Sequence, residues 1–216
     1  MRGDLHIHSN FSGDGRQSVE DILRLCREHR LEVLAITDHN CMDCYPVKVD
    51  GIILLQGMEI TSASGHILAY HITEPVPRDR SVEETIDLIH AQGGIAIAPH
   101  PYRWWSGLKE ANVRGQRFDG VEVLNGRSLR SSNARAARLA RSMGVAEVGG
   151  SDAHVTDHVA RAYTVFPDDC QNADDLVKAI RARRTTAGGE SRKLAESFNY
   201  GTKSILRWAR RGFRRL

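Results

Sequence analysis

Histidine and carboxylate side chains recur at the ends of short apolar runs in this sequence. The first example is His6-Ile7-His8, which closes the run of residues 4–8. Successive side chains of a strand point to opposite faces, so both imidazoles would project from one face and Ile7 from the other. Two neutral imidazoles held side by side are suitable ligands for a divalent metal ion. On its own, this pair fits two surface histidines equally well. The other histidines and carboxylates of the sequence therefore have to distinguish a metal site from a surface pair.

Residues of the same types follow further apolar runs along the chain. A helix cap or a hydrogen-bonded core histidine would explain any one of them, but burying all of them without partners would be costly. Together they predict a metal site. The positions are Asp38 and His39 after LEVLAIT, Glu59 after ILLQGM, His66 at the start of HILAYH, His100 after IAIAP, and Asp152 and His154 after VAEVGGS.

The apolar runs alternate with amphipathic segments that predict helices. Ser18 and Ser81 precede Asp21 and Glu84 by three residues, a spacing typical of a helix capping box. Strand–helix alternation predicts an α/β barrel or a doubly wound sheet, and in such a barrel the active site lies at the carboxyl ends of the strands. The expected strands are 4–8, 33–37, 51–55, 66–71, 95–99, 120–124, 145–149 and 163–166, and the expected helices are 19–26, 82–90, 134–143 and 173–182.

Composition and charge limit the classes of protein to which this chain can belong. Of the 216 residues, 41% are hydrophobic and 26% are charged, which is typical of one globular domain. No apolar run reaches the ~20 residues that span a bilayer, and the first ten residues lack a secretory signal, so we expect a soluble, cytoplasmic protein. Residues 190–216 carry eight Lys and Arg against two acids, a net charge of +6. Residues 1–189 carry 22 against 25, a net charge of −3.

Six sequence blocks together indicate a known protein family. DLHIHSNFSGDG, AITDHN, GMEI, GHILAY, APHP and GSDAH occur in this order between Asp4 and His154. This pattern resembles the polymerase and histidinol phosphatase (PHP) domain family. The resemblance implies a distorted (β/α)7, TIM-like barrel over residues 1–189, with two to three divalent ions on its carboxyl face. Residues 190–216 would add a short basic C-terminal helix.

The resemblance also implies the metal ligands, position by position. Some relatives have His where this chain has Asp14. Imidazole and carboxylate ligands suit Zn, Mn or Fe. The implied ligands are His6, His8, Glu59 and Asp152 for a first ion, Glu59, His66 and His100 for a second, and Asp14, His39 and His154 for a third.

The implied reaction is hydrolysis of phosphate esters by a metal-activated water molecule. We expect Glu59, Asp152 and His154 to be the catalytic residues, and a phosphorylated small molecule or a nucleotide to be the substrate. One alternative is a nuclease or nucleotide phosphatase that acts on RNA or DNA ends. Another is a non-catalytic, metal-stabilised module that recruits a partner, although a complete ligand set argues against it.

Several polar residues near the expected strand ends are candidates for substrate binding. Arg103 follows His100, and its guanidinium offers a fork for phosphate. The adjacent Trp104-Trp105 could stack on a base or pack under the loop. Asn125, Arg127 and Arg130 follow the run VEVLN and could meet further phosphate oxygens. Glu122, inside that run, is expected to line the wall of the site.

Cys41 and Cys44 form a C-x-x-C pair directly after His39. A zinc knuckle needs a second such pair, which the sequence lacks. A redox pair remains an alternative to two incidental thiols.

The basic segment of residues 190–216 is amphipathic at helical spacing. Such a helix suits an anionic partner, either nucleic acid or a membrane surface. The alternative is that its apolar stripe packs on the barrel or on a second subunit, and the oligomeric state stays open. The stripe is Ile205, Trp208, Ala209, Phe213 and Leu216, opposite Lys203, Arg207, Arg210, Arg211 and Arg214.

Overall fold

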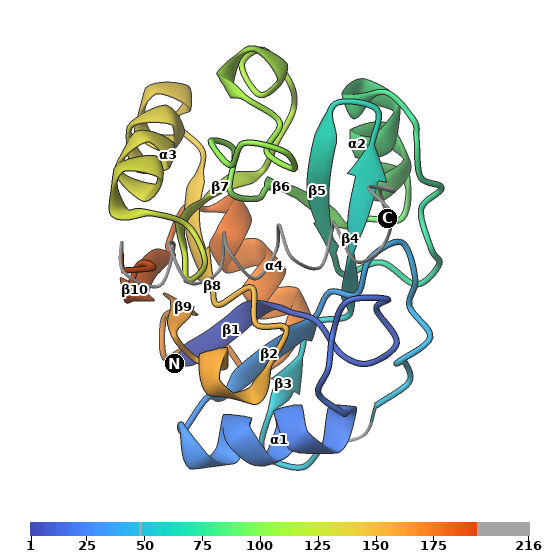
Figure 1. The fold of residues 1–216 in the computed structure, drawn as a ribbon, viewed down its shortest axis with the longest axis vertical. Coiled ribbons are helices and arrows are strands. Elements are labelled where there is room, and N and C mark those ends of the chain that lie inside the picture. The colour runs from blue at the N-terminus through green and yellow to red at the C-terminus, as the bar shows by residue number, and fades with distance from the viewer. Residues whose placement is uncertain (48, 194–216) are drawn as a thin grey trace, which may run out of the picture.

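The computed structural model describes residues 1–47 and 49–193 (Figure 1). This part of the chain alternates strands and helices, as the sequence predicts. The expected helix at 203–216 lies outside the described residues. The elements are β1 (Arg2–Ile7), α1 (Val19–Glu28), β2 (Val33–Ile36), β3 (Ile53–Leu54), β4 (Gly57–Ser62), β5 (Gly65–Tyr70), α2 (Val82–Ala91), β6 (Ile95–Ala98), β7 (Gly120–Asn125), α3 (Arg130–Met143), β8 (Ala146–Gly150), β9 (Ala162–Val165), α4 (Ala173–Arg181) and β10 (Thr186–Gly189).

The strands form two five-stranded sheets. Their orders are β10-β9-β1-β2-β3 and β4-β5-β6-β7-β8. Parallel pairs join β1 to β2 and β6 to β7 to β8, whereas β4–β5, β5–β6 and β9–β10 are antiparallel. Isolated bridges, Ile7 to Ala153 and His39 to Glu59, connect the two sheets.

The expected α/β class is confirmed, but the expected (β/α)7 barrel is not. No single closed sheet runs through residues 1–47 and 49–193, and this part of the chain has four α-helices rather than seven. The physical reason is the antiparallel hairpins, which need no crossover helix between their strands.

The helices begin and end where local chemistry predicts. Ser18 and Ser81 each form a complete capping box, with Asp21 and Glu84 respectively. Helix α3 ends at Gly144, whose φ of +65° is left-handed, as expected for this type of helix end. It begins at Arg130 rather than at residue 134.

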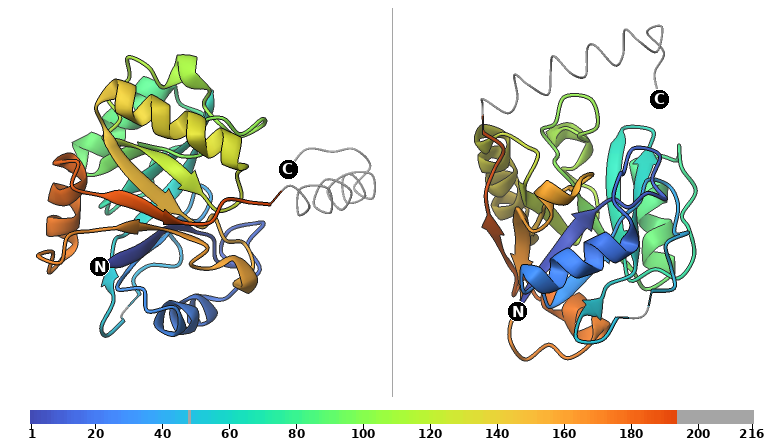
Figure 2. Two further views of the ribbon diagram at one scale, coloured as in Figure 1. Left: turned by 90° about the vertical axis from the view of Figure 1, so that its left-hand side faces the viewer. Right: turned by 60° about the horizontal axis from the view of Figure 1, so that its bottom comes forward.

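Each helix packs an apolar face against the sheets (Figure 2). Ile22 and Cys26 of α1 lie in one core cluster with Ile7, Leu34 and Ile36. Helices α2 and α3 share a second cluster with β4 to β7, and α4 covers a third with β1, β2, β6 and β8. These buried faces hold the strands firmly, so that their carboxyl ends present side chains in fixed positions. In the part of the chain that the structure describes, no helix combines the length and the apolar character needed to cross a membrane.

Candidate metal centre

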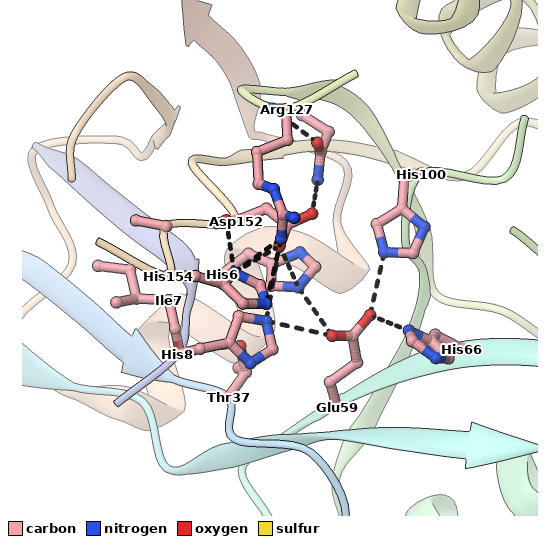
Figure 3. A network of polar contacts seen from close by, with 12 residues as sticks. His6, Ile7, His8, Thr37, Glu59, His66, His100, Arg127, Asp152 and His154 are labelled. Carbon is pink, nitrogen blue, oxygen red and sulfur yellow. Dashed lines mark hydrogen bonds and ion pairs between the residues drawn. The ribbon is translucent and has the colours of Figure 1, made fainter. Parts of the chain in front are cut away.

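Glu59 lies at the centre of a cluster of histidines (Figure 3). Its Oε1 atom lies 2.8 Å from Nδ1 of His66 and 3.0 Å from Nε2 of His100. Its Oε2 atom lies 3.2 Å from Nε2 of His6, 3.2 Å from Nε2 of His8 and 3.4 Å from Nδ1 of His39. A single buried carboxylate therefore faces five imidazoles, a donor set that suits a bridging metal ligand.

Two strands of one hairpin place Glu59 and His66. The sequence analysis expected Glu59 to follow a strand at 51–55, but that run contributes only the two-residue β3, and Glu59 lies inside β4. His66 lies in β5, where it pairs with Thr61 of β4. The antiparallel pairing brings His66 back beside Glu59, seven residues away in the chain.

Asp152 approaches the same cluster from the end of β8. Its Oδ1 atom lies 3.9 Å from Nε2 of His6 and 3.6 Å from Nε2 of His8. Asp152 has a positive φ of +54°, and its backbone N–H donates to the His6 carbonyl at 2.6 Å. This hydrogen bond ties the turn after β8 to the end of β1, so the carboxylate faces the two histidines.

A second, more exposed cluster adjoins the first. Nε2 of His154 lies 2.9 Å from Oδ2 of Asp14, and Nε2 of His39 lies 3.7 Å from the same oxygen. One nitrogen of His8 also belongs to this group. His39 therefore stands between the two clusters, with Nδ1 toward Glu59 and Nε2 toward Asp14. All nine expected ligands converge on one end of the sheets.

Glu122 holds two of the clustered histidines in place. Its Oε1 atom accepts a hydrogen bond from Nδ1 of His6 at 2.9 Å, and its Oε2 atom accepts one from the backbone N–H of His100 at 2.9 Å. Asn125 donates from Nδ2 to Glu122 Oε2 at 3.0 Å and to Asp152 Oδ2 at 3.1 Å. A carboxylate behind a metal-binding histidine fixes its ring orientation.

Asp38 has a different role from the clustered carboxylates. It accepts hydrogen bonds from the backbone N–H of Ser9 at 2.7 Å and from the Ser9 hydroxyl at 2.5 Å. Asp38 thereby holds the segment after His8 against the end of β2.

Two imidazole nitrogens in the inner cluster are buried without a hydrogen-bond partner. They are Nδ1 of His100, and Nε2 of His8, whose 3.2 Å approach to Glu59 Oε2 lacks hydrogen-bond geometry. A buried polar atom without a partner is costly unless something binds it. Burial together with the neighbouring His154 and His39 lowers the pKa of His8, and burial together with Arg103 lowers the pKa of His100 to about 3. Both rings are neutral near pH 7, the form that binds a metal ion.

The carboxylates of the cluster are ionised. Burial alone would raise the pKa of Glu59, but the charges of His66, His6 and His39 outweigh it and hold that pKa well below its usual range. Burial likewise raises the pKa of Asp152, but the charges of Arg103 and Arg127 outweigh this effect. The pKa of Asp152 is therefore also lowered. The neutral rings of His8 and His100, together with the charged carboxylates, fit divalent cations.

Two arginines bind the outer side of Asp152. Nη2 of Arg103 lies 2.5 Å from Asp152 Oδ2 and 2.8 Å from Asn125 Oδ1. Nη1 of Arg127 lies 3.1 Å from Asp152 Oδ1 and 2.8 Å from Nδ1 of His154. Arg103, Asn125 and Arg127 therefore meet at the metal-facing carboxylate. Arg130, the first residue of α3, lies elsewhere and lines a neighbouring hollow with residues 189–193.

A cavity of about 500 Å³ opens above the clusters. Glu59, Asp152, Arg103 and Arg127 line it, together with Trp104 and Trp105. Among the lining residues that the sequence analysis missed, Arg192 is the charged one, and it was missed because its position in the basic segment suggested a separate tail. A backbone hydrogen bond from Arg192 to the Ser128 carbonyl, at 3.0 Å, holds it there. No signal in the sequence indicates this pairing between residues 64 positions apart.

The C-x-x-C pair lies beside the cluster without the features of a redox site. Burial raises the pKa of the Cys41 thiol, and burial together with Asp38 raises that of Cys44. Reactive cysteines have lowered pKa values, because the thiolate is the nucleophile. The geometry favours two incidental thiols.

Several known proteins are similar to this chain in sequence. Residues 130–185 match the model of a family described as PHP-associated. The chain is 38% identical to the uncharacterized protein MJ1587 of Methanocaldococcus jannaschii over 140 residues, covering 58% of this chain and 82% of that protein. It is 30% identical to the uncharacterized protein MJ0417 of the same organism over 185 residues, covering 82% of this chain and 75% of that protein.

A solved structure shares the fold. It is a two-domain protein of Bacteroides vulgatus that contains a predicted PHP-like metal-dependent phosphoesterase, with a TM-score of 0.67 and 22% identity. The match covers 88% of this chain and 65% of that chain, so this chain spans just under two thirds of that protein. The family match, the shared fold and the clustered histidines lead to one conclusion: the chain belongs to the PHP domain family.

Proposed function

We propose that this protein hydrolyses phosphate esters at a centre of two or three divalent ions. The observation that carries the proposal is the buried Glu59 carboxylate, which faces five imidazole nitrogens within 3.4 Å. Such a carboxylate is suited to bridge two ions. Divalent ions held there would activate a water molecule and offset negative charge on the phosphoryl group.

The proposed ligands fall into the three groups expected from the family resemblance. Zn, Mn and Fe all suit this mixture of nitrogen and oxygen donors. We assign His6, His8, Glu59 and Asp152 to the first ion, Glu59, His66 and His100 to the second, and Asp14, His39 and His154 to the third, which is supported by the contacts of Glu59, Asp152 and Asp14 with these histidines.

The cations around the cavity would bind the substrate. Arg103 and Arg127 face the outer oxygens of Asp152, so a phosphoryl group entering the cavity would meet both guanidinium groups. Guanidinium forks bind phosphate oxygens in pairs and hold the group in a fixed orientation. Asn125, between Arg103 and Asp152, keeps the fork aligned.

His154 is placed to carry a proton between the cavity and solvent. Its side chain is partly exposed, and Nδ1 lies 3.4 Å from Asp152 Oδ1. When no third ion occupies its nitrogen, an imidazole that contacts both a carboxylate and solvent can pass a proton between them. We therefore assign catalytic roles to Glu59, Asp152 and His154, as the sequence analysis expected.

The test compares wild type with Glu59→Gln and with Glu147→Gln as the matched control. Glu147 lies on β8 and pairs with Arg141 outside the cavity. Elemental analysis of unchelated wild-type protein should give two to three ions per chain. Hydrolysis of an aryl phosphate should fall at least about a hundredfold in Glu59→Gln and stay unchanged in Glu147→Gln. Less than one ion per chain, or a folded Glu59→Gln variant with a tenth of the wild-type rate, would contradict the proposal.

A nuclease or nucleotide phosphatase is the second candidate. Trp104, Trp105 and Arg192 at the cavity favour it, because aromatic and basic groups together suit nucleotides. Comparing a mononucleotide, a short single-stranded RNA and a sugar phosphate under the same conditions separates the candidates. A partner-recruiting module without activity would hydrolyse none of them.

A further inference from the structure

Two neighbouring tryptophans stand exposed at the rim of the cavity. Trp104 is 81% exposed and Trp105 is 84% exposed, and their ring centroids are 6.4 Å apart. Both rings line the same cavity as Glu59 and Asp152. Indole rings are usually buried, because an exposed ring offers a large apolar surface to water. Exposed indole rings are therefore often functional. Their place on the cavity wall points to a ligand.

The loop that carries the two rings is tied down on several sides. The backbone N–H of Arg103 donates to the His100 carbonyl at 2.9 Å, and that of Lys109 donates to the Pro101 carbonyl at 2.9 Å. The backbone N–H of His66 donates to the Ser106 carbonyl at 2.9 Å, which joins the loop to strand β5. The loop is therefore positioned by the same strand that places a proposed metal ligand.

Two further features keep the loop in this shape. The Lys109 ammonium donates to the carbonyl of Arg103 and, at 2.6 Å, to that of Trp104. A Cβ atom at Gly107 would lie 2.7 Å from the Arg103 backbone and from the His100 carbonyl, so only glycine fits there. The rings are thus displayed by a constrained loop, which reduces the entropy lost when a ligand binds.

The chemistry of the rim indicates what would lie against the rings. Arg103, directly before Trp104, reaches the metal-facing Asp152, so phosphate recognition and the aromatic rings are adjacent in the chain. The cavity of about 500 Å³ lies in the range of pockets that hold a whole small-molecule ligand, far more than one phosphate group. The part of the cavity that a phosphate group would leave free lies beside the two tryptophans.

The planes of the two rings stand at 69° to each other, so a flat ligand can stack on one indole and contact the other at its edge. We propose that Trp104 and Trp105 form such an aromatic platform, which selects phosphate esters with a planar aromatic ring, such as a nucleobase, over aliphatic phosphate esters. The proposal rests on the proposed function, because it assigns the substrate preference of the same site. Stacking on an aromatic side chain tolerates any base, since every base has a π-face. The platform would therefore select for an aromatic ring without distinguishing one base from another.

The experiment measures KM for adenosine monophosphate and for ribose 5-phosphate on the full-length, metal-loaded protein. In Trp104→Ala and Trp105→Ala, KM for the nucleotide should rise about tenfold or more, while KM for the sugar phosphate should stay the same. Trp104→Phe should restore most of the loss. Leu88→Ala is the control, because Leu88 is an exposed apolar residue on α2, 39% exposed, outside the cavity lining. A short single-stranded oligonucleotide as third substrate distinguishes a free nucleotide from a strand end.

Ligand binding supplies a readout that does not depend on turnover. In a Trp208→Phe background only Trp104 and Trp105 emit, because the chain has three tryptophans. Adenosine monophosphate should quench this emission, and ribose 5-phosphate should not. Equal KM changes for both substrates would show a role in loop structure instead, and would overturn the proposal. So would unchanged KM values with a shift to smaller oligomers, which would show an interface between copies. If the wild type hydrolyses no ester yet the nucleotide quenches emission, the proposed function fails and the platform stands.

Discussion

Nδ1 of His6 donates a hydrogen bond to Oε1 of Glu122 at 2.9 Å, and this contact turns Nε2 of His6 toward Glu59, 3.2 Å away. The orientation of a proposed metal ligand is thus set by a residue on a different strand, 116 positions later in the chain. Glu122 also holds the backbone of His100 through its second oxygen. One buried carboxylate therefore positions two of the proposed ligands.

Replacing Glu122 should weaken metal binding without removing a ligand. In Glu122→Gln, the His6 ring loses its charged partner, and metal affinity should fall about 10–100-fold, the range seen when such supporting groups are removed. Titration against a chelator of known affinity measures the change. Glu147→Gln serves again as control. A Glu122→Gln protein that retains wild-type affinity would show that the His6 orientation is set by packing alone.

Metal binding should release protons, mainly from His6 and His66. Burial lowers the pKa of His6, but Glu122, Glu59 and Asp152 outweigh it and raise that pKa well above its usual value. The pKa of His66 is also raised, because Glu59 outweighs the effect of burial. The raised pKa values favour the protonated form of both rings, and such a proton has to leave when a metal ion binds. Apparent affinity should therefore fall as the pH is lowered, by up to about a hundredfold per pH unit if both protons compete.

Calorimetry in buffers of different ionisation enthalpy counts the released protons at pH 7. We expect proton release in the wild type, and a smaller release in His66→Gln. His8 and His100 add nothing to this count, because their pKa values are lowered. An observed enthalpy that does not depend on the buffer would contradict the assignment.

Removing the metal should lower thermal stability. A ligand that binds only the folded state at about 100 times its Kd adds about 2.7 kcal/mol to the free energy of unfolding. For a chain of this size that corresponds to a rise in Tm of about 5–10 °C. Thermal unfolding with and without a chelator measures the difference, and adding Zn or Mn back should restore it. Identical melting curves, with the metal content verified, would show that the clusters do not hold an ion in the folded protein.

The basic C-terminal segment is tested best by two truncations. A chain ending at Lys193 loses six of the eight cations of residues 190–216 but keeps Arg192. We expect its rate on a small phosphate ester to be unchanged, and its binding to RNA or anionic vesicles to weaken. In the full-length protein that binding should also fall steeply with salt.

A chain ending at Gly189 should behave differently. It also loses Ser191, whose hydroxyl accepts a hydrogen bond from Asn133 at 3.0 Å, and Arg192, which lines the cavity. A higher KM and a lower Tm are expected for this variant alone. Equal polyanion binding by the full chain and by the chain ending at Lys193 would show that the segment is not a recruitment device. A lower Tm for the chain ending at Lys193 would show that it packs on the body of the protein.

The sequence alone determined the donor chemistry and the local geometry. Period 2 along β1 requires His6 and His8 to share a face, and capping residues mark where α1 and α2 begin. The alternation of strands and helices predicts the α/β class. These features depend on neighbours only a few residues apart, whereas the grouping of the ligands is implied only by the resemblance to the PHP family.

Only the tertiary structure decided the sheet arrangement and the remaining members of the site. The two-sheet arrangement depends on which strands pair, and strands far apart in the chain, such as β1 and β9, pair without leaving a periodic signal in the sequence. Glu122 reaches His6 because β7 packs beside β6 and β8, and Arg192 reaches the cavity because residues 190–193 follow β10 past Ser128. Contacts between residues far apart in sequence arise from packing of whole elements, so no local pattern of residues encodes them.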